Sequence, residues 1–273
     1  MLAVSQLFIY PIKSLGGIAL QSAELTATGF KNDRRWMLAD EQNVFLSQRT
    51  TPKMALLQPV ETNDGFMVFH KNNPAAHILI PFNMELNKKV KAVIWEDKCD
   101  AYEADYSINE WFSEMLKTNC KLLYMPDDTK RFVDTGYAFN KETTSFSDAY
   151  PLMMIGQNAL DFLNNKLDVP LPLDRFRPNI VFKGGKPHCE DEMAEFTING
   201  TRFFGVKPCS RCVVTTINQQ TSEKGFEPLK TLAGYRSKNN KIYFGQNILH
   251  QTNGRITVGD QITVASYSIT FIP

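Results

Sequence analysis

Two cysteines, Cys209 and Cys212, are separated by two residues in a segment that also carries Lys207 and Arg211. Nearby positive charge favours a thiolate over a thiol, and a thiolate is a soft ligand for transition metals. A redox pair of the thioredoxin type lies at the start of a helix, whereas the β-branched run after Cys212 predicts a strand over residues 212–217. The pair is therefore typical of metal chemistry, although from its spacing alone an incidental structural pair is equally acceptable.

Other uses of the thiols have less support. A tetrahedral zinc site needs a second pair of ligands, and none appears at suitable spacing, although His188-Cys189 could contribute. Five cysteines at scattered positions do not form the framework of a disulfide-stapled secreted domain. We interpret His188 as a rim or structural residue, and Cys99 and Cys120 as core or semi-exposed thiols.

Basic side chains elsewhere could bind an anion. Arg177 stands at the start of a predicted strand over residues 179–182, where a guanidinium can bind a phosphate through two hydrogen bonds. Lys13 and Arg34 add cations on two early loops. Each alone is most simply a solvated surface charge, so only their combination indicates a site. Because the net charge is +1, such a site must be local, and we expect neither nucleic-acid nor membrane binding.

Short strands separated by turns must position these residues. Alternating and β-branched runs predict strands over residues 4–12, 18–25, 36–39, 66–70, 77–81, 90–94, 179–182, 195–198, 201–204, 212–217 and 256–264. Asn199-Gly200, between two such runs, predicts a hairpin turn. Helical spacing predicts helices over residues 107–116, 157–166 and 228–235, with Ser107 as the cap of the first. The expected class is mainly β with some α, as a barrel or sandwich.

The chain length of 273 residues suggests one large or two ordinary domains. The polar, irregular stretch over residues 126–144 favours a boundary near residues 118–130. The first residues lack the basic start and cleavage site of a signal peptide, and no apolar run is long enough for a membrane helix. We therefore expect a cytoplasmic protein.

Eight short segments extend the picture along nearly the whole chain. They are FIYPIKS, DRRW, SDAYPLMMI, FRPNIVF, CSRCVVTTIN, EPLKTLAGYR, FGQNIL and ITVGDQITV. In this order they resemble the MOSC family, the domains that end the molybdenum cofactor sulfurases, together with its N-terminal partner domain. The nearest likeness is to the amidoxime-reducing component and its bacterial relatives. The resemblance implies an N-terminal MOSC-associated β-barrel domain over residues 1–120 and a MOSC β-barrel domain over residues 121–273.

The resemblance also implies a molybdenum cofactor (Mo-molybdopterin) and the residues that bind it. The family's metal ligand is the cysteine followed by an aliphatic pair and Thr-Thr, which is Cys212 here. The implied cofactor contacts are Lys13, Ser14, Arg34, Ser147, Tyr150, Arg177, Asn179, Ser210 and Arg211. Asp148 would position water or relay a proton, or else cap a turn. The chain departs from the mitochondrial proteins at Ala149 and Tyr150, where they have small hydroxyl residues.

Three functions follow from the resemblance. The first is an oxidoreductase that reduces small N-hydroxylated compounds. Because the chain has no second cysteine cluster for an iron–sulfur centre, an electron-donor protein, such as a ferredoxin or flavin reductase, is expected. The second is a sulfur-carrier or cofactor-handling module with a persulfide on Cys212 or Cys209. In the sulfurases a pyridoxal-phosphate domain supplies the sulfur, and this chain is too short to include one. The third is a cofactor storage or delivery protein.

Overall fold

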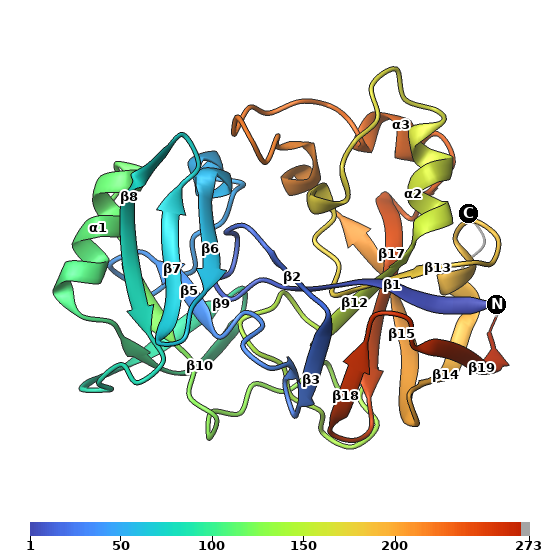
Figure 1. Cartoon of the computed structure of the whole chain (residues 1–273), viewed down its shortest axis with the longest axis horizontal. Helices are drawn as coiled ribbons and strands as arrows, with labels where there is room; N and C mark the ends of the chain where they lie inside the picture. The colour runs from blue at the N-terminus through green and yellow to red at the C-terminus, as the bar shows by residue number, and fades with distance from the viewer. Residues whose placement is uncertain (269–273) are drawn as a thin grey trace.

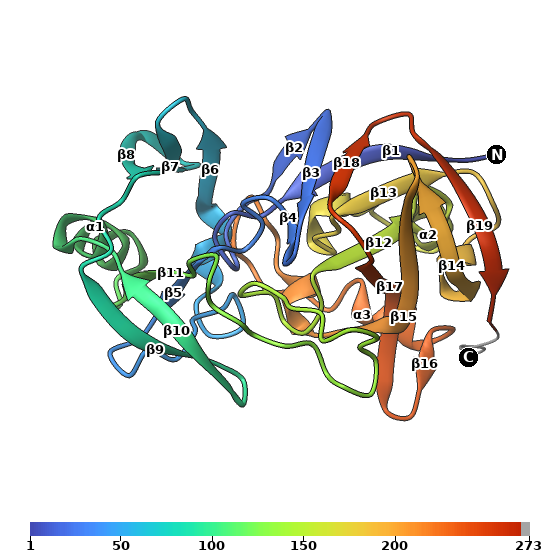
Figure 2. The ribbon, with the colours of Figure 1, turned by 90° about the horizontal axis from the view of Figure 1, so that it is seen from below.

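The computed structural model describes residues 1–268 and is built mostly from strands, which confirms the predicted class. Seven strands form a closed ring, because β12 pairs with both β13 and β17. In ring order they are β12 (Leu152–Gly156), β13 (Ile180–Lys183), β1 (Leu2–Ile9), β19 (Gln261–Tyr267), β14 (Met193–Ile198), β15 (Thr201–Arg211) and β17 (Lys241–His250). We call this ring the barrel. It forms one of two bodies that lie side by side (Figure 1; Figure 2).

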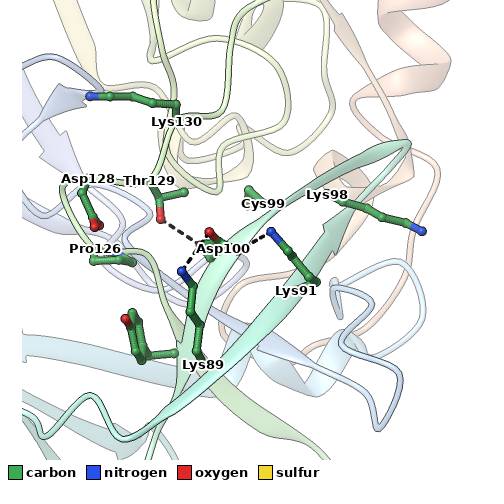
Figure 3. A pocket seen from close by; sticks show the side chains of 10 residues that line it. Lys89, Lys91, Lys98, Cys99, Asp100, Pro126, Asp128, Thr129 and Lys130 are labelled. Atoms are coloured by element: carbon green, nitrogen blue, oxygen red, sulfur yellow. Dashed lines mark hydrogen bonds and ion pairs between the residues drawn. The ribbon is translucent and has the colours of Figure 1, made fainter.

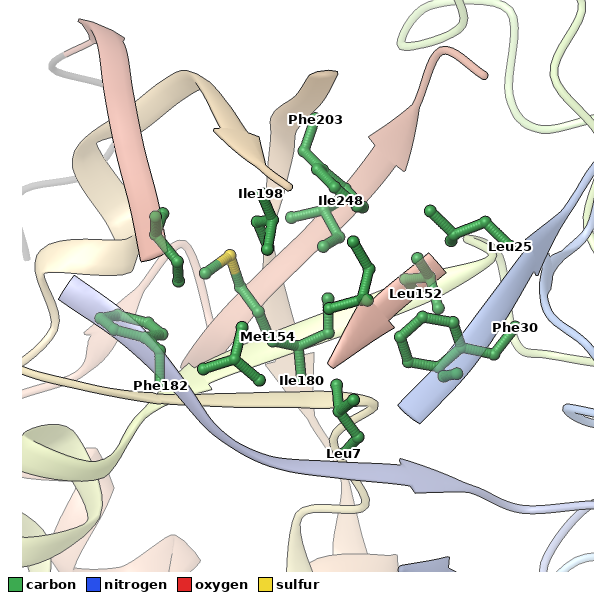
Figure 4. Close-up of a cluster of buried hydrophobic side chains, with 14 of the residues drawn as sticks. Leu7, Leu25, Phe30, Leu152, Met154, Ile180, Phe182, Ile198, Phe203 and Ile248 are labelled. Carbon is green, nitrogen blue, oxygen red and sulfur yellow. The ribbon is translucent and has the colours of Figure 1, made fainter. Parts of the chain in front are cut away.

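The barrel is filled with side chains (Figure 4). Met154, Ile180 and Ile248 are fully buried on three of its strands, and the rings of Phe196 and Phe203 stack with centroids 5.5 Å apart. Alternate residues of a strand point to opposite faces, so the inward set forms this core. Burying each such side chain stabilises the fold by roughly 1.5–3 kcal/mol.

The start of the chain belongs to the barrel in space. β1 pairs with β13 and β19, and β3 (Ser22–Thr26) pairs with β4 (Gly29–Phe30) and with β18 (Gly254–Thr257). β2 (Ile18–Leu20) pairs with the end of β1 in antiparallel orientation. The division of the chain after residue 120 stays a prediction, since the strands of its two parts interleave.

The second body, called here the N-terminal body, contains two sheets. One consists of β5 (Trp36–Ala39), β11 (Lys121–Tyr124), β10 (Asp97–Glu103) and β9 (Lys88–Ile94). The other consists of β6 (Leu57–Glu61), β7 (Gly65–His70) and β8 (Asn73–Pro81). Helix α1 (Tyr106–Leu116) packs Ile108 and Phe112 into the core beside these sheets. The predicted cap was wrong, because the helix begins at Tyr106 and its N-cap is Asp105 rather than Ser107.

Two further helices and several short pieces complete the described chain. α2 (Gln157–Asn164) and α3 (Leu229–Ala233) lie beside the barrel, and β16 (Ser237–Lys238) pairs with β17. The 3₁₀-helices are Pro52–Leu56, Leu173–Arg175, Cys189–Glu192 and Val213–Thr216. The hairpin turn at Asn199-Gly200 is confirmed, with both residues at positive φ between β14 and β15. No helix within residues 1–268 is long and apolar enough to cross a membrane.

The strand predicted over residues 212–217 was wrong. β15 runs through the cysteine segment and ends at Arg211, and the next residues form the 3₁₀-helix Val213–Thr216. The hydroxyl of Thr215 donates to the carbonyl of Cys212 at 3.0 Å, and Thr216 donates to Val213 at 2.8 Å. These local hydrogen bonds compete with strand pairing, and they override the strand preference of the β-branched residues.

A buried carboxyl group beside the barrel, that of Glu190, makes the free energy of unfolding depend on pH. Glu190 is fully buried and accepts a hydrogen bond from the backbone N–H of Gly156 at 3.2 Å. Burial, reinforced by neighbouring Asp191, raises its pKa from 4.5 to about 7. Between these values the folded protein holds a proton that the unfolded chain releases, so the free energy of unfolding falls as pH rises through this window.

We therefore expect Glu190→Gln to stabilise the protein at pH 8 by about 3 kcal/mol or less, because each pKa unit is worth about 1.4 kcal/mol. At pH 4.5 the gain should vanish. Urea unfolding at both pH values measures it, and Glu192→Gln is the control, since Glu192 is a partly exposed neighbour that pairs with Lys186. An equal effect of Glu190→Gln at both pH values would contradict the assignment.

Candidate functional site

A cavity of about 580 Å³ opens between the barrel and the N-terminal body. Its lining joins the end of β15, the loops before β12 and β13, two loops near residues 13 and 47, and the tip of the β9–β10 hairpin. Every site residue predicted from the sequence lines it. They are Lys13, Ser14, Arg34, Ser147, Asp148, Tyr150, Arg177, Asn179, Ser210, Arg211 and Cys212. The structure thus brings the set together, while the role of each residue stays a prediction.

Each cysteine of the pair faces a guanidinium. Arg211 Nη1 lies 3.0 Å from Cys209 Sγ, and Arg49 Nη2 lies 3.4 Å from Cys212 Sγ. Cys209 belongs to β15, whereas Cys212 follows the end of that strand, where backbone pairing stops. Both thiols line the cavity. The structure therefore places one positive charge directly beside each sulfur.

Two arginines of the cavity lining both stack on one buried aromatic ring, that of Tyr10. The guanidinium of Arg34 lies 4.6 Å from the ring centroid of Tyr10, and that of Arg177 lies 4.2 Å from it. Buried Asp33 fixes Arg34 through an ion pair of 2.6 Å and accepts from the backbone of Tyr10 at 2.8 Å. Burial raises the pKa of Tyr10 despite both guanidinium groups, so the ring stays a neutral platform.

Three buried nitrogen donors, each on an arginine of the cavity lining, have no hydrogen-bond partner within residues 1–268. They are Arg177 Nη2, Arg211 Nε and Arg175 Nε. Burial lowers the pKa of Arg177 to about 10, which reflects the cost of an uncompensated charge. Since unmet buried donors are rare in folded proteins, an anion in the cavity would satisfy them. Asn179 differs, because its side chain already bonds Arg34, the backbone of Met153 and the backbone of Phe8.

Lys13 and Asp148 form an ion pair of 2.6 Å at the rim. Burial lowers the pKa of Lys13, and Asp148 counteracts this shift. The charge and hydrogen bond of Lys13, together with the charges of Arg49 and Arg34, hold the pKa of Asp148 well below its usual range. Asp148 is therefore ionised, with its side chain 67% exposed.

The loop that carries Asp148 is held by a cation that the sequence analysis did not identify. Arg131 donates to the backbone carbonyls of Ser147 and Asp148 at 2.6 and 2.9 Å, and it pairs with Asp97 at 2.8 Å. The hydroxyl of Ser147 donates to the carbonyl of Tyr150 at 2.7 Å, so it is already used within the loop. These bonds thus fix the position of Asp148 before any ligand binds.

The lining carries far more positive than negative charge. Its cations within the described chain are Lys13, Arg34, Arg49, Arg175, Arg177, Lys207, Arg211 and Lys241, and its one carboxylate is Asp148. Because the whole chain has a net charge of only +1, the excess is concentrated here. A second hollow of about 290 Å³ is different, since Lys89 and Lys91 pair there with Asp100 and no predicted site residue lines it (Figure 3).

Arg49 and Trp95 are two lining residues that contact predicted site residues and that sequence reasoning missed. Arg49 stacks on Trp95 at 4.4 Å and reaches Cys212 from the N-terminal body. Trp95 donates through Nε1 to Asp148 at 3.4 Å. In the sequence, both residues are far from the cysteine segment, and neither belongs to a motif that indicates a site. In the structure, Trp95 is unusual because it has a positive φ in a tight turn.

A buried amide pair holds the Arg49 segment against the barrel side. Gln48 donates to Gln219 at 3.0 Å, Gln219 donates back at 2.9 Å, and Gln48 also donates to the carbonyl of Ser14 at 2.7 Å. We expect Gln48→Ala to lower the free energy of unfolding by about 1–3 kcal/mol, because it leaves buried polar groups unpaired. Urea unfolding measures this, with exposed Gln42→Ala as the control. A loss no larger than that of the control would contradict the stabilising role of the Gln48–Gln219 pair.

Within residues 1–268, no three His, Cys, Asp or Glu side chains cluster as a metal site of their own. A metal at Cys212 would therefore have to bring other ligands with it. A metal carried on an anionic organic group fits this donor set, since the thiol supplies one soft ligand and the unpartnered arginine nitrogens suit a phosphate.

The chain is similar to known proteins over most of its length. Residues 1–119 match the MOSC N-terminal beta barrel domain, and residues 141–263 match the MOSC domain. Mitochondrial amidoxime-reducing component 1 of Xenopus laevis is 26% identical over 95% of this chain and 81% of that protein. The Homo sapiens protein of the same name is 28% identical over 95% and 82%. Molybdenum cofactor sulfurase of Caenorhabditis elegans is 28% identical over 92% of this chain, which spans a third of that protein (33%).

These matches confirm the family resemblance on which the site residues were chosen. The two domain matches follow each other along the chain, and residues from both line the cavity that contains Cys212. The chain therefore belongs to the MOSC family, as a protein that joins a MOSC N-terminal beta barrel domain to a MOSC domain.

Proposed function

We propose that this protein is a molybdenum-dependent oxidoreductase that reduces N-hydroxylated compounds with electrons from a separate donor protein. The observation that carries the proposal is the placement of Cys212 beside Arg49 in a cavity whose lining is strongly cationic. The names of the amidoxime-reducing relatives support the substrate class. Cys212 would bind the metal, and the cations would bind the phosphate of the pterin.

The protein's own residues would bind, orient and supply protons. Arg177 and Arg34, which both stack on Tyr10, would anchor the phosphate, and Arg211 would add a third guanidinium beside the cysteine pair. The bound cofactor supplies two-electron oxygen-transfer chemistry, which the protein does not. Cleaving an N–O bond consumes protons, and Lys13 Nζ, whose pKa burial lowers, lies at the rim on Asp148 Oδ1. This pair would pass protons toward the substrate.

The test is the molybdenum content of protein made in a cofactor-competent host, by elemental analysis, with pterin fluorescence after oxidation. Near-stoichiometric metal and pterin are expected. Benzamidoxime should be reduced with a ferredoxin or flavin reductase present, and not with NADH alone. Absence of both molybdenum and pterin would refute the proposal, while turnover with NADH alone would refute the need for a donor.

A second function is favoured by the paired thiols and by the sulfurase relatives. A persulfide on Cys209 or Cys212 would be stabilised as an anion by Arg211 or Arg49, and it could pass sulfur to a cofactor. Mass spectrometry of the native protein should then find an adduct of about 32 Da on one thiol. If protein that binds molybdenum has only unmodified thiols, the sulfur-carrier function is refuted and the oxidoreductase function remains.

A further inference from the structure

The tip of the β9–β10 hairpin carries a large aromatic residue where the backbone favours glycine. Trp95 and Glu96 form a two-residue turn between the paired residues Ile94 and Asp97, and Trp95 has a φ of 56°. Glycine is preferred at the first position of such a turn, and a bulky residue there is strained. Strain of this kind persists where contacts hold it and is common at binding sites. The side chain of Trp95 therefore needs an explanation beyond the turn.

Three contacts hold the Trp95 ring at the cavity rim. The ring of Phe45 lies 4.9 Å away between centroids, the Arg49 guanidinium lies 4.4 Å from the ring, and Nε1 donates to Asp148 Oδ1 at 3.4 Å. The residue is nevertheless 47% exposed, and it lines the same cavity as Cys212. The ring is thus oriented by the protein while much of its surface stays open to a ligand.

Asp148 has an acceptor atom left over. Lys13 Nζ and Trp95 Nε1 both donate to Oδ1, and no residue of the described chain donates to Oδ2. Asp148 is also the one carboxylate among the described lining residues. A positively charged ligand would be repelled by the rest of the lining and attracted here.

The Arg49 contact indicates the shape of group that this ring accepts. A guanidinium is planar and delocalised, and such cations stack on indole rings. Amidines and guanidines share this planar arrangement of nitrogens around one carbon. Their N–H groups also match a carboxylate oxygen that is free to accept.

We propose that Trp95 and Asp148 form a subsite for the planar head of an amidine- or guanidine-type ligand. The ring stacks on the head group, and Asp148 Oδ2 accepts from its N–H groups. The subsite rests on the proposed function, because reduction of an N-hydroxylated amidine releases an amidine, whose planar cationic head is the group assigned here. Trp95 is a specificity-determining residue in this arrangement.

The probes are benzamidine, which is a planar cation, and benzamide, which has nearly the same shape and no charge. Calorimetric titration of the purified protein should find benzamidine bound about tenfold more tightly. Asp148→Asn should remove that difference. Trp95→Gly should weaken both ligands by about tenfold without lowering the melting temperature, because the turn relaxes. Glu96→Gln, at the neighbouring turn position outside the lining, is the matched control and should change neither.

Equal affinities of the wild type for the two probes, or unchanged affinities in both Trp95→Gly and Asp148→Asn, would overturn the subsite. Molybdenum measured on the same preparations keeps this result separate from the proposed function. Metal without selective benzamidine binding removes the subsite alone. Selective binding without metal removes the oxidoreductase and leaves the subsite as a site for amidine-type cations.

Discussion

The Cys212→Ser variant is expected to lose more than about 99% of its bound molybdenum and its reductase activity while keeping its pterin. Changing residues that merely support metal ligands costs about 10–100-fold in affinity, so removing a ligand costs at least that much. A serine oxygen is harder than sulfur and is not ionised at neutral pH. Arg34 and Arg177, which would anchor the pterin phosphate, lie on other segments and are unchanged. Elemental analysis and pterin fluorescence on the same sample measure the two losses separately.

Cys209→Ser is the matched control, because Cys209 lines the same cavity and also faces a guanidinium. Its metal content should stay near that of the wild type. Equal losses in the two variants would contradict the assignment of Cys212 as the single protein ligand. Loss in Cys209→Ser alone would move the ligand to that residue.

The sequence was sufficient to predict a set of residues that line the cavity, but it was not sufficient to identify Arg49, which completes the lining beside Cys212. The predicted residues all line the cavity, and they lie in loops or at strand ends, chiefly ahead of β12 and β13 and at the end of β15. Arg49 comes instead from the N-terminal body, and its position depends on the buried pair of Gln48 and Gln219, which are 171 residues apart. A contact of that range leaves no local pattern in the sequence.

Strand prediction failed where side chains satisfy the backbone locally. Residues 213–216 have the β-branched composition of a strand, yet the Thr215 and Thr216 hydroxyls close a 3₁₀ turn directly after Cys212. The pairing of β1 with β13 and β19 was equally hidden, because periodicity identifies a strand and not its partners. The mainly β class could be predicted, since it depends only on how many such runs the chain contains.

Arg177→Gln is expected to change cofactor binding and stability in opposite directions. The guanidinium lies on Tyr10 and has a buried Nη2 with no partner among the described residues. A phosphate would supply that partner, and a charge-assisted hydrogen bond contributes about 1.5–3 kcal/mol. Retained pterin should therefore fall by about tenfold or more in the variant.

In cofactor-free protein the same charge is a cost, because burial lowers the pKa of Arg177 to about 10. Replacing an uncompensated buried charge by a neutral amide should leave the melting temperature unchanged or raise it. Pterin fluorescence and thermal melts of cofactor-free protein test the two effects, with Arg202→Gln, at a surface ion pair with Glu195, as the control. A variant that retains pterin would remove Arg177 from the phosphate site. A cofactor-free variant that melts well below the control would mean that Arg177 is needed for folding, and that its unpartnered nitrogen is not waiting for an anion.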